Sequence, residues 1–303
     1  MTRAMRGVAR APGTCGELAQ GMLEDSLVMV TCPIDLYSTA SVTLRAGQGQ
    51  IDGPTECSKA VHAVALVLEH LDRADLDATL TIDSPIPRKK GMASSTADIV
   101  ASMVATASAL GRSIDENTLA ELALAVEPSD GIMVPGIALF DHLGGSVRRS
   151  LGQPPPLNVL VLEFEPTLDT EAFNATDRRA TLRSHRESFC RALALIEAGI
   201  ATADSELVGR GATLSAMAYQ AVLPKPQLPE VLSIAEACGA VGVNVAHSGT
   251  VIGLLFAQDG KHLDAVSSHA RRRLPDLVAV HRQRLIGGGA ATLVGELVPT
   301  DAC

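Results

Sequence analysis

The chain changes from loop to helix within the stretch Pro85-Ile86-Pro87-Arg88-Lys89-Lys90-Gly91-Met92-Ala93-Ser94-Ser95-Thr96-Ala97-Asp98. Prolines, three cations and a glycine come first, and an apolar run of small residues follows them. This order predicts a helix over residues 93–110 that begins between residues 91 and 95. A helix N-terminus exposes about four unpaired N–H groups and a positive dipole end, which suit a phosphate chain. The alternative is an ordinary helix capped by serine.

Composition limits the classes of protein that fit. The chain has 303 residues, enough for one large or two medium domains. Hydrophobic residues make up 47% of the chain, but aromatic residues make up only 2% of it. A net charge of −9 and the shortage of aromatic residues argue against a nucleic-acid partner. In an acidic chain the three cations at residues 88–90 indicate an anion site, although they also fit a solvated turn.

The cysteines and the N-terminus bear on the compartment. The six cysteines lack metal-binding spacing and fit reduced thiols, and they are Cys15, Cys32, Cys57, Cys190, Cys238 and Cys303. Neither a signal-peptide apolar region nor an apolar run of about 18 residues is present. We therefore expect a cytoplasmic protein without a membrane partner. The sequence leaves its oligomeric state open.

The order of predicted elements indicates an α+β fold in two domains. Residues 11–21 look turn-rich, residues 27–31 and 37–44 look like strands, and residues 61–71 look like a helix. A helix over 115–126 follows a capping-box pattern of Ser113 and Glu116. Three prolines at 154–156 predict a boundary, which divides the chain into 1–152 and 153–303. Residues 242–256 look like two strands joined by a tight Ser-Gly turn, and mostly antiparallel sheets are expected.

The candidate chemistry is phosphoryl transfer, which needs a phosphate cradle, Mg²⁺ and a group that positions or deprotonates a hydroxyl. The loop is not a Walker A motif, and the chain has no kinase-type GxGxxG. Glu127 and Asp130 lie in one turn and would supply Mg²⁺ with oxygen ligands, unless the turn is merely solvated. The Asp141-His142 pair lacks the GxSxG elbow of a hydrolase.

Three motifs in this order resemble those of the GHMP kinases, and the resemblance covers residues 11–256. The motifs are APGxxGEL at residues 11–18, PxxxGMASSTAD at 87–98 and AHSGTVIG at 246–253. Other strings resemble a group within the family that phosphorylates L-threonine for cobalamin synthesis, namely CPID at 32–35, EPSD at 127–130 and LPKP at 223–226. The resemblance implies an N-terminal α+β domain with a left-handed βαβ crossover, and a ferredoxin-like C-terminal domain.

The resemblance also implies site residues, with ATP, Mg²⁺ and L-threonine as ligands. Ser95 and Glu127 would hold the metal, and Asp130 would accept the hydroxyl proton or only orient it. The ATP phosphates would be bound by Pro87, Arg88, Lys89, Lys90, Gly91, Met92, Ala93, Ser94, Ser95, Thr96 and Ala97. The acceptor would be bound by Thr14, Cys15, Gly16, Glu17, Asp35, His247, Ser248 and Gly249.

One position departs from the family pattern. Mevalonate kinases have a catalytic lysine in the first motif where this chain has Thr14. Lys89, Lys90 or Mg²⁺ alone would then have to supply the positive charge. Two other functions fit the same motifs: a kinase for another small alcohol, homoserine first, and a regulator that binds nucleotide without catalysis.

Overall fold

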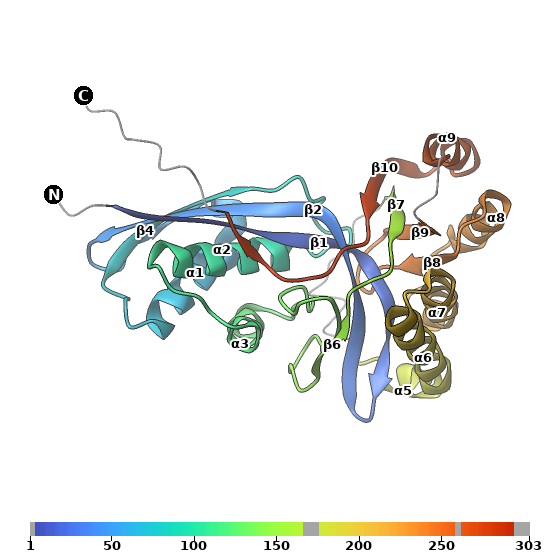
Figure 1. Ribbon diagram of the computed structural model, residues 1–303, viewed down its shortest axis with the longest axis horizontal. Coiled ribbons are helices and arrows are strands. Elements are labelled where there is room, and N and C mark those ends of the chain that lie inside the picture. Colours follow the sequence, from blue (N-terminus) through green and yellow to red (C-terminus); the bar gives the residue numbers. More distant parts are fainter. Residues whose placement is uncertain (1–3, 166–175, 258–261, 294–303) are drawn as a thin grey trace.

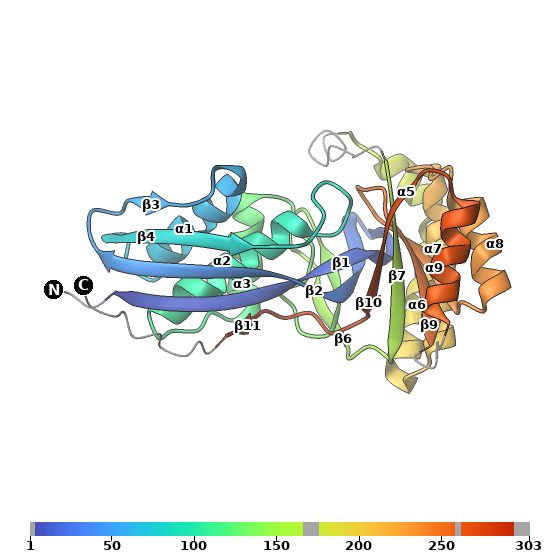
Figure 2. The same cartoon turned by 90° about the horizontal axis from the view of Figure 1, so that it is seen from above.

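The computed structural model describes residues 4–165, 176–257 and 262–293. The molecule is elongated, with the N-terminal half at one end and the C-terminal half at the other (Figures 1 and 2). One sheet runs through both halves in the order β10-β7-β9-β8-β1-β2-β4-β3, while β11 pairs with β1 and β5 joins β2 to β6. Among the described strands only β3 and β4 pair in parallel.

The strands are β1 (Met5–Leu23), β2 (Ser26–Ala46), β3 (Ile51–Asp52), β4 (Leu76–Asp83), β5 (Ile137–Asp141), β6 (Arg148–Gly152), β7 (Leu157–Phe164), β8 (Gly242–Val245), β9 (Ile252–Ala257), β10 (Leu277–Arg284) and β11 (Ala291–Thr292). The helices of the N-terminal half are η1 (Thr55–Cys57), α1 (Ser58–His70), α2 (Ser94–Ala109) and α3 (Glu116–Val126). Those of the C-terminal half are α5 (Arg179–Ser184), α6 (Arg186–Thr202), α7 (Ser205–Ala218), η2 (Tyr219–Ala221), α8 (Leu228–Cys238) and α9 (Leu263–Arg273).

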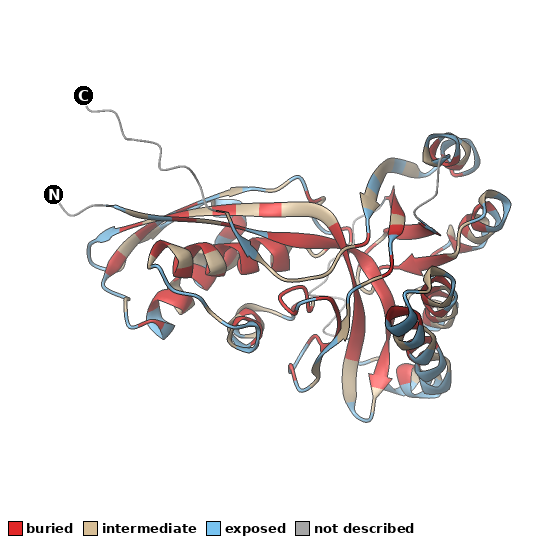
Figure 3. Cartoon of the chain, in the orientation of Figure 1, coloured by how far each residue is buried: buried red, intermediate tan, exposed pale blue. Residues whose placement is uncertain are grey.

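Helix α2 confirms the predicted change from loop to helix. It is built mainly from small residues, and most of its length is buried between α1 and the long strands β1 and β2 (Figure 3). A helix buried on nearly all sides carries few charged residues, as this sequence has. The N-terminus of α2 is thereby fixed close to the middle of the sheet.

Three local predictions were wrong. The turn-rich segment 11–21 is part of β1, because register shifts accommodate its prolines and glycines within a strand paired to β2. Asp115 caps α3, not Ser113, since its carboxylate accepts from the N–H groups of Asn117 and Thr118. Strands β8 and β9 are joined by the longer loop 246–251, because the carbonyl of Lys90 occupies two N–H groups of that loop.

The core crosses the predicted boundary at 154–156. One apolar cluster joins Leu18 of β1 to Phe189 and Ile196 of α6, and a second lies between β7, β8, β9, α8 and α9. Strand β11 returns from the C-terminal half to pair with Ala9 and Arg10 of β1. Division into 1–152 and 153–303 stays a prediction. In the described part of the chain no helix combines the length and the apolar character that crossing a membrane requires.

Candidate active site

A cavity of about 570 Å³ lies where the loop before α2 meets α1 and the turn after α3. Its walls come from β1, the start of α1, the loop and N-terminus of α2, the turn after α3 and the loop after β8. The lining residues are Glu17, Glu56, Cys57, Ser58, Lys59, Ala60, Arg88, Lys89, Gly91, Met92, Ala93, Ser94, Ser95, Thr96, Asp98, Glu127, Pro128, Asp130 and Ser248. Most residues predicted to bind ATP therefore line one cavity.

The loop before α2 has an unusual backbone. Lys89, Gly91 and Ala93 all have positive φ, at 59°, 82° and 54°. Side chains other than glycine rarely adopt this conformation, and such strain persists where the surroundings hold it, often at ligand clamps. Ala93 is the N-cap of α2 and its side chain caps nothing, which leaves the first N–H groups of the helix directed at the cavity for an anion.

Ser95 and Glu127 meet at the cavity wall. The Ser95 hydroxyl donates to one carboxylate oxygen of Glu127, and the Lys59 ammonium pairs with the other. One oxygen of Glu127 thus already pairs with a cation. Among the described residues no group of three His, Cys, Asp or Glu could enclose a metal. Mg²⁺ commonly takes one or two carboxylates and fills its remaining positions with hydroxyl, phosphate and water oxygens, so this pair fits it.

Asp130 and Glu17 are two carboxylates at the cavity wall. Burial, with the charge of Glu127 as the second cause, raises the pKa of Asp130 to about 6. Burial also raises the pKa of Glu17, with the charge of Asp130 as the second cause. The Glu17 carboxylate accepts from the backbone N–H of His247 at 2.6 Å. At neutral pH Asp130 is mostly ionised and able to accept a proton.

Backbone hydrogen bonds bring the three sequence motifs together. The N–H groups of Thr14 and Gly16 donate to the carbonyls of Met92 and Gly91, at 3.0 and 3.1 Å. The N–H groups of Thr250 and Val251 both donate to the carbonyl of Lys90, at 3.0 and 3.1 Å. The loop before α2 is therefore held from both sides by segments far away in sequence.

Several predicted site residues lie behind the cavity wall. Thr14, Cys15, Gly16, His247 and Gly249 belong to the segments that hold the loop, but their side chains do not line the cavity. Burial raises the pKa of the Cys15 thiol, which keeps it protonated. Pro87 lies at the start of the loop and Ala97 is buried inside α2, and neither lines the cavity.

Two predicted site residues, Lys90 and Asp35, direct their charged groups away from the cavity. Lys90 is buried, and its ammonium donates to the carbonyl of Phe164 at 2.8 Å and to Glu165 at 2.9 Å. It therefore does not face the cavity as a phosphate ligand would. Asp35 pairs with Arg284 of β10 at 2.8 Å and does not line the cavity either. Lys89 does line it.

Three features of the site were missed from the sequence. Glu56 to Ala60 form a wall of the cavity, yet their sequence carries no phosphate-binding or metal-binding signal. Lys59 was overlooked as the partner of Glu127 because the two are far apart in sequence. Lys225 is buried close to Glu17, and its string LPKP was the one available signal.

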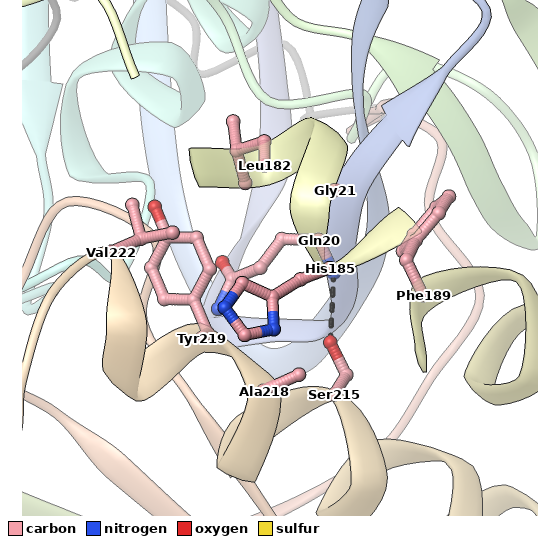
Figure 4. Close-up of a pocket in the computed structure, with 9 residues that line it drawn as sticks. All are labelled: Gln20, Gly21, Leu182, His185, Phe189, Ser215, Ala218, Tyr219 and Val222. Carbon is pink, nitrogen blue, oxygen red and sulfur yellow. Dashed lines mark hydrogen bonds between the residues drawn. The ribbon is translucent and has the colours of Figure 1, made fainter. Parts of the chain in front are cut away.

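A second, small cavity lies between β1, α5, α6 and α7. Its volume is about 10 Å³, enough for one water at most. Figure 4 shows His185 and Tyr219 beside Gln20, whose backbone N–H donates to Ser215 at 3.1 Å. This cavity is too small for a substrate.

The Asp141-His142 pair does not form a hydrolase site. The Asp141 carboxylate accepts from the backbone N–H groups of Leu143, Gly144 and Ser146 in its own turn. The His142 ring instead packs edge-on against the His247 ring, with centroids 4.7 Å apart. Burial lowers the pKa of His142 to about 4, so its ring is neutral at pH 7.

Comparison with known protein families identifies the family of the chain. The family model for the N-terminal domain of GHMP kinases matches residues 58–140, and the model for their C-terminal domain matches residues 193–276. The chain belongs to the GHMP kinase family and is an ATP-dependent small-molecule kinase. A regulator without catalysis, the third alternative drawn from the sequence, is thereby set aside.

Individual relatives are similar over most of their length. An L-threonine kinase of Salmonella typhimurium is 40% identical over 249 residues, 82% of each chain. An L-threonine kinase of Citrobacter freundii is 36% identical, over 86% of this chain and 89% of its own. The crystal structure of homoserine kinase from Cytophaga hutchinsonii superimposes with a TM-score of 0.74 at 17% identity, over 97% of this chain and 98% of its own. These likenesses confirm the predicted two-domain GHMP kinase fold.

Proposed function

We propose that this protein is an L-threonine kinase, which converts ATP and L-threonine to ADP and O-phospho-L-threonine. The observation that carries the proposal is one cavity that joins the α2 N-terminus, the Ser95–Glu127 pair and Asp130. Phosphoryl transfer requires these three parts together. The L-threonine kinases at 40% and 36% identity support threonine as the acceptor. In this role the enzyme is cytoplasmic, and its product O-phospho-L-threonine is the precursor of the aminopropanol linker of cobalamin.

The residues of the chain divide the work as follows. The N–H groups at the start of α2 and the exposed Lys89 bind the ATP phosphates. The nucleoside of ATP lies against the cavity wall formed by Glu56 to Ala60. Ser95 and Glu127 hold Mg²⁺, which neutralises the phosphate charge when it is bound. Glu17 is the acidic partner for the ammonium group of the amino acid.

Asp130 acts on the acceptor hydroxyl. The threonine oxygen forms a bond to the γ-phosphorus as the bond from that phosphorus to the bridging oxygen of ADP breaks, and Asp130 takes the hydroxyl proton. A carboxylate with a pKa of about 6 is ionised at neutral pH and sufficiently basic for this transfer. Thr14 stands where mevalonate kinases have lysine, so the cation there must come from another residue or from Mg²⁺.

Homoserine is the second candidate acceptor, because homoserine kinases of two bacteria are 26% and 27% identical to this chain. Turnover of Mg-ATP by the purified protein separates the two candidates. ADP release is measured with L-threonine, D-threonine, L-serine, L-homoserine and mevalonate, with an acceptor-free blank. We expect the highest kcat/KM with L-threonine. Turnover of homoserine without turnover of threonine would overturn the proposal.

A further inference from the structure

Lys225 is a buried cation beside the active site to which the reaction described above assigns no task. It lies in the Pro-rich loop between η2 and α8, and only 6% of its surface is exposed. Its ammonium donates to the carbonyl of Gly249, in the loop that joins β8 to β9. Burying an ammonium is expensive unless it is paired, so a buried lysine at this place calls for a physical reason.

The segment that carries Lys225 donates hydrogen bonds to two carbonyls of the loop 246–251. Lys225 holds the carbonyl of Gly249, and the Tyr219 hydroxyl donates to the carbonyl of His247 at 3.2 Å. The segment is itself braced, since the backbone N–H of Lys225 donates to the Gln220 side chain at 2.7 Å. Tyr219 belongs to η2, at the edge of the small cavity in Figure 4.

The opposite side of the loop 246–251 touches the loop before α2, residues 84–93, which we call the phosphate loop. Gly249 lies so close that a Cβ atom on it would be 2.2 Å from the Lys90 carbonyl oxygen. The adjacent Thr250 and Val251 donate their N–H groups to that carbonyl. A displacement of Gly249 would therefore also displace the backbone at Lys90, in the loop proposed to bind the ATP phosphates.

Lys225 also balances charge. Glu17 and Asp130 place two carboxylates in the buried part of the site, and Lys225 is the cation whose charge acts on Glu17. Burial lowers the pKa of His142 and of His247 and raises that of Tyr219, so these three are neutral at pH 7. Arg178, the residue before α5, is a second cation whose charge acts on His247, and its charge also acts on Tyr219.

We infer that Lys225 is a positioning residue for phosphoryl transfer: its ammonium fixes Gly249 against the phosphate loop and offsets the charge of Glu17. It thereby supplies, from the C-terminal half, positive charge that the first motif lacks at Thr14. The inference rests on the proposed kinase reaction, but not on which alcohol accepts the phosphoryl group.

The activity should depend on the charge of Lys225 at alkaline pH. Burial lowers the pKa of Lys225 to about 8, with the charge of Glu17 opposing that shift. Activity that needs the ammonium falls as pH rises through 8. Stability behaves in the opposite way: between pH 8 and about 10.4 the unfolded lysine holds more protons than the folded one, so the contribution of this group to stability rises. Activity and stability should therefore diverge above pH 8.

The test compares Lys225→Met and Lys225→Arg with Arg210→Met, a control that removes an exposed cation from α7. Turnover and the urea midpoint of unfolding are measured from about pH 6.5 to about pH 10, the range that spans the lysine titration. We expect Lys225→Met to lower kcat/KM for the acceptor at least about tenfold at neutral pH. The alkaline fall near pH 8 should be present in the wild type and in Arg210→Met. In Lys225→Arg only the part of the fall that the substrate ammonium causes should remain, because arginine stays charged.

Three results would overturn the inference: full activity of Lys225→Met, an unchanged alkaline fall in Lys225→Arg, or parallel loss of activity and stability in the wild type. The last comparison needs no variant and holds even if Lys225→Met does not fold. The substrate ammonium also titrates in this range, but it would give the same alkaline fall in Lys225→Arg as in the wild type. If the wild type turns over homoserine and not threonine, the proposed function fails, and the Lys225 comparison is made with homoserine.

Discussion

At the scale of single residues, Asp130 is the proposed base, and its ionised form lowers the stability of the folded protein. Its carboxylate is partly buried at the cavity wall and lies close to the charge of Glu127, and both effects disfavour the ionised form. The folded protein at pH 7 therefore contains a carboxylate that would be more easily ionised in the unfolded chain. A pKa of about 6 against an ordinary 3.8 corresponds to up to about 3 kcal/mol of destabilisation.

The variant Asp130→Asn should separate the contribution of this carboxylate to catalysis from its cost in stability. If the carboxylate is the base, kcat falls by about 100-fold or more. The free energy of unfolding at pH 7 should rise by about 1–3 kcal/mol, because the buried charge is gone. In the wild type, turnover should fall as pH drops through 6, where Asp130 takes up its proton. Steady-state kinetics and urea denaturation check both effects. A fall in kcat of only a few fold would mean that Asp130 orients the hydroxyl without accepting its proton.

At the scale of elements, the loop 246–251 matters because of how closely it approaches the phosphate loop. Gly249 has no room for a side chain, since a Cβ atom would lie 2.3 Å from the backbone nitrogen of Gly91. Gly239, at the C-terminus of α8, offers a matched control. It has a positive φ of 69°, and the space where a Cβ atom would stand is open.

Gly249→Ala should displace the loop from the phosphate loop and raise KM for ATP while lowering kcat. We expect a loss of about 1–3 kcal/mol in stability from the overpacking. Gly239→Ala should lose about 1–2 kcal/mol through backbone strain alone and keep its kinetic constants. The kinetic constants of both variants are compared at equal fractions of folded protein. They distinguish an effect of the contact between Gly249 and the phosphate loop from a general effect of backbone strain. Equal kinetic losses in the two variants would contradict this account of Gly249.

At the scale of the whole molecule, Lys90 links the two halves of the chain. Its side chain reaches from the phosphate loop to the end of β7, where the Phe164 carbonyl also accepts from the Thr250 hydroxyl at 2.8 Å. Glu163, next to it, pairs with Lys90 at 3.6 Å and with His281 of β10 at 2.9 Å. The phosphate loop is thus part of the contact between the halves, in addition to the shared sheet and core.

Lys90→Met should therefore lower mainly the stability of the protein, and Lys89→Met should weaken mainly the binding of ATP. Loss of the buried Lys90 should reduce the free energy of unfolding by about 3 kcal/mol, because its acidic partners stay behind unpaired. Loss of the exposed Lys89, which lines the cavity, should leave unfolding within about 0.5 kcal/mol and raise KM for ATP. Urea denaturation and ATP kinetics on the two neighbours check this. A large rise in KM for Lys90→Met with unchanged stability would restore Lys90 as a phosphate ligand.

Much of the fold was predictable because its signals are local. The helices α1, α2 and α3 follow from composition and periodicity within a few residues. The segment 11–21 was not predictable as a strand, since its prolines and glycines indicate turns and only pairing with β2 accommodates them. Where a neighbouring strand supplies the hydrogen bonds, local propensity decides little.

The sequence by itself determined the helix α2 and the loop before it, and it predicted phosphate binding there and an acidic turn at Glu127 and Asp130. Each of these is a short run whose chemistry is independent of distant residues. Only the tertiary structure decided which charges face the cavity. Lys89 lines it, Lys90 turns to β7, Asp35 pairs with Arg284, and Lys225 reaches Gly249. A long charged side chain points toward the partner that lowers its energy most. That partner is set by contacts between segments far apart in sequence, which no local pattern encodes.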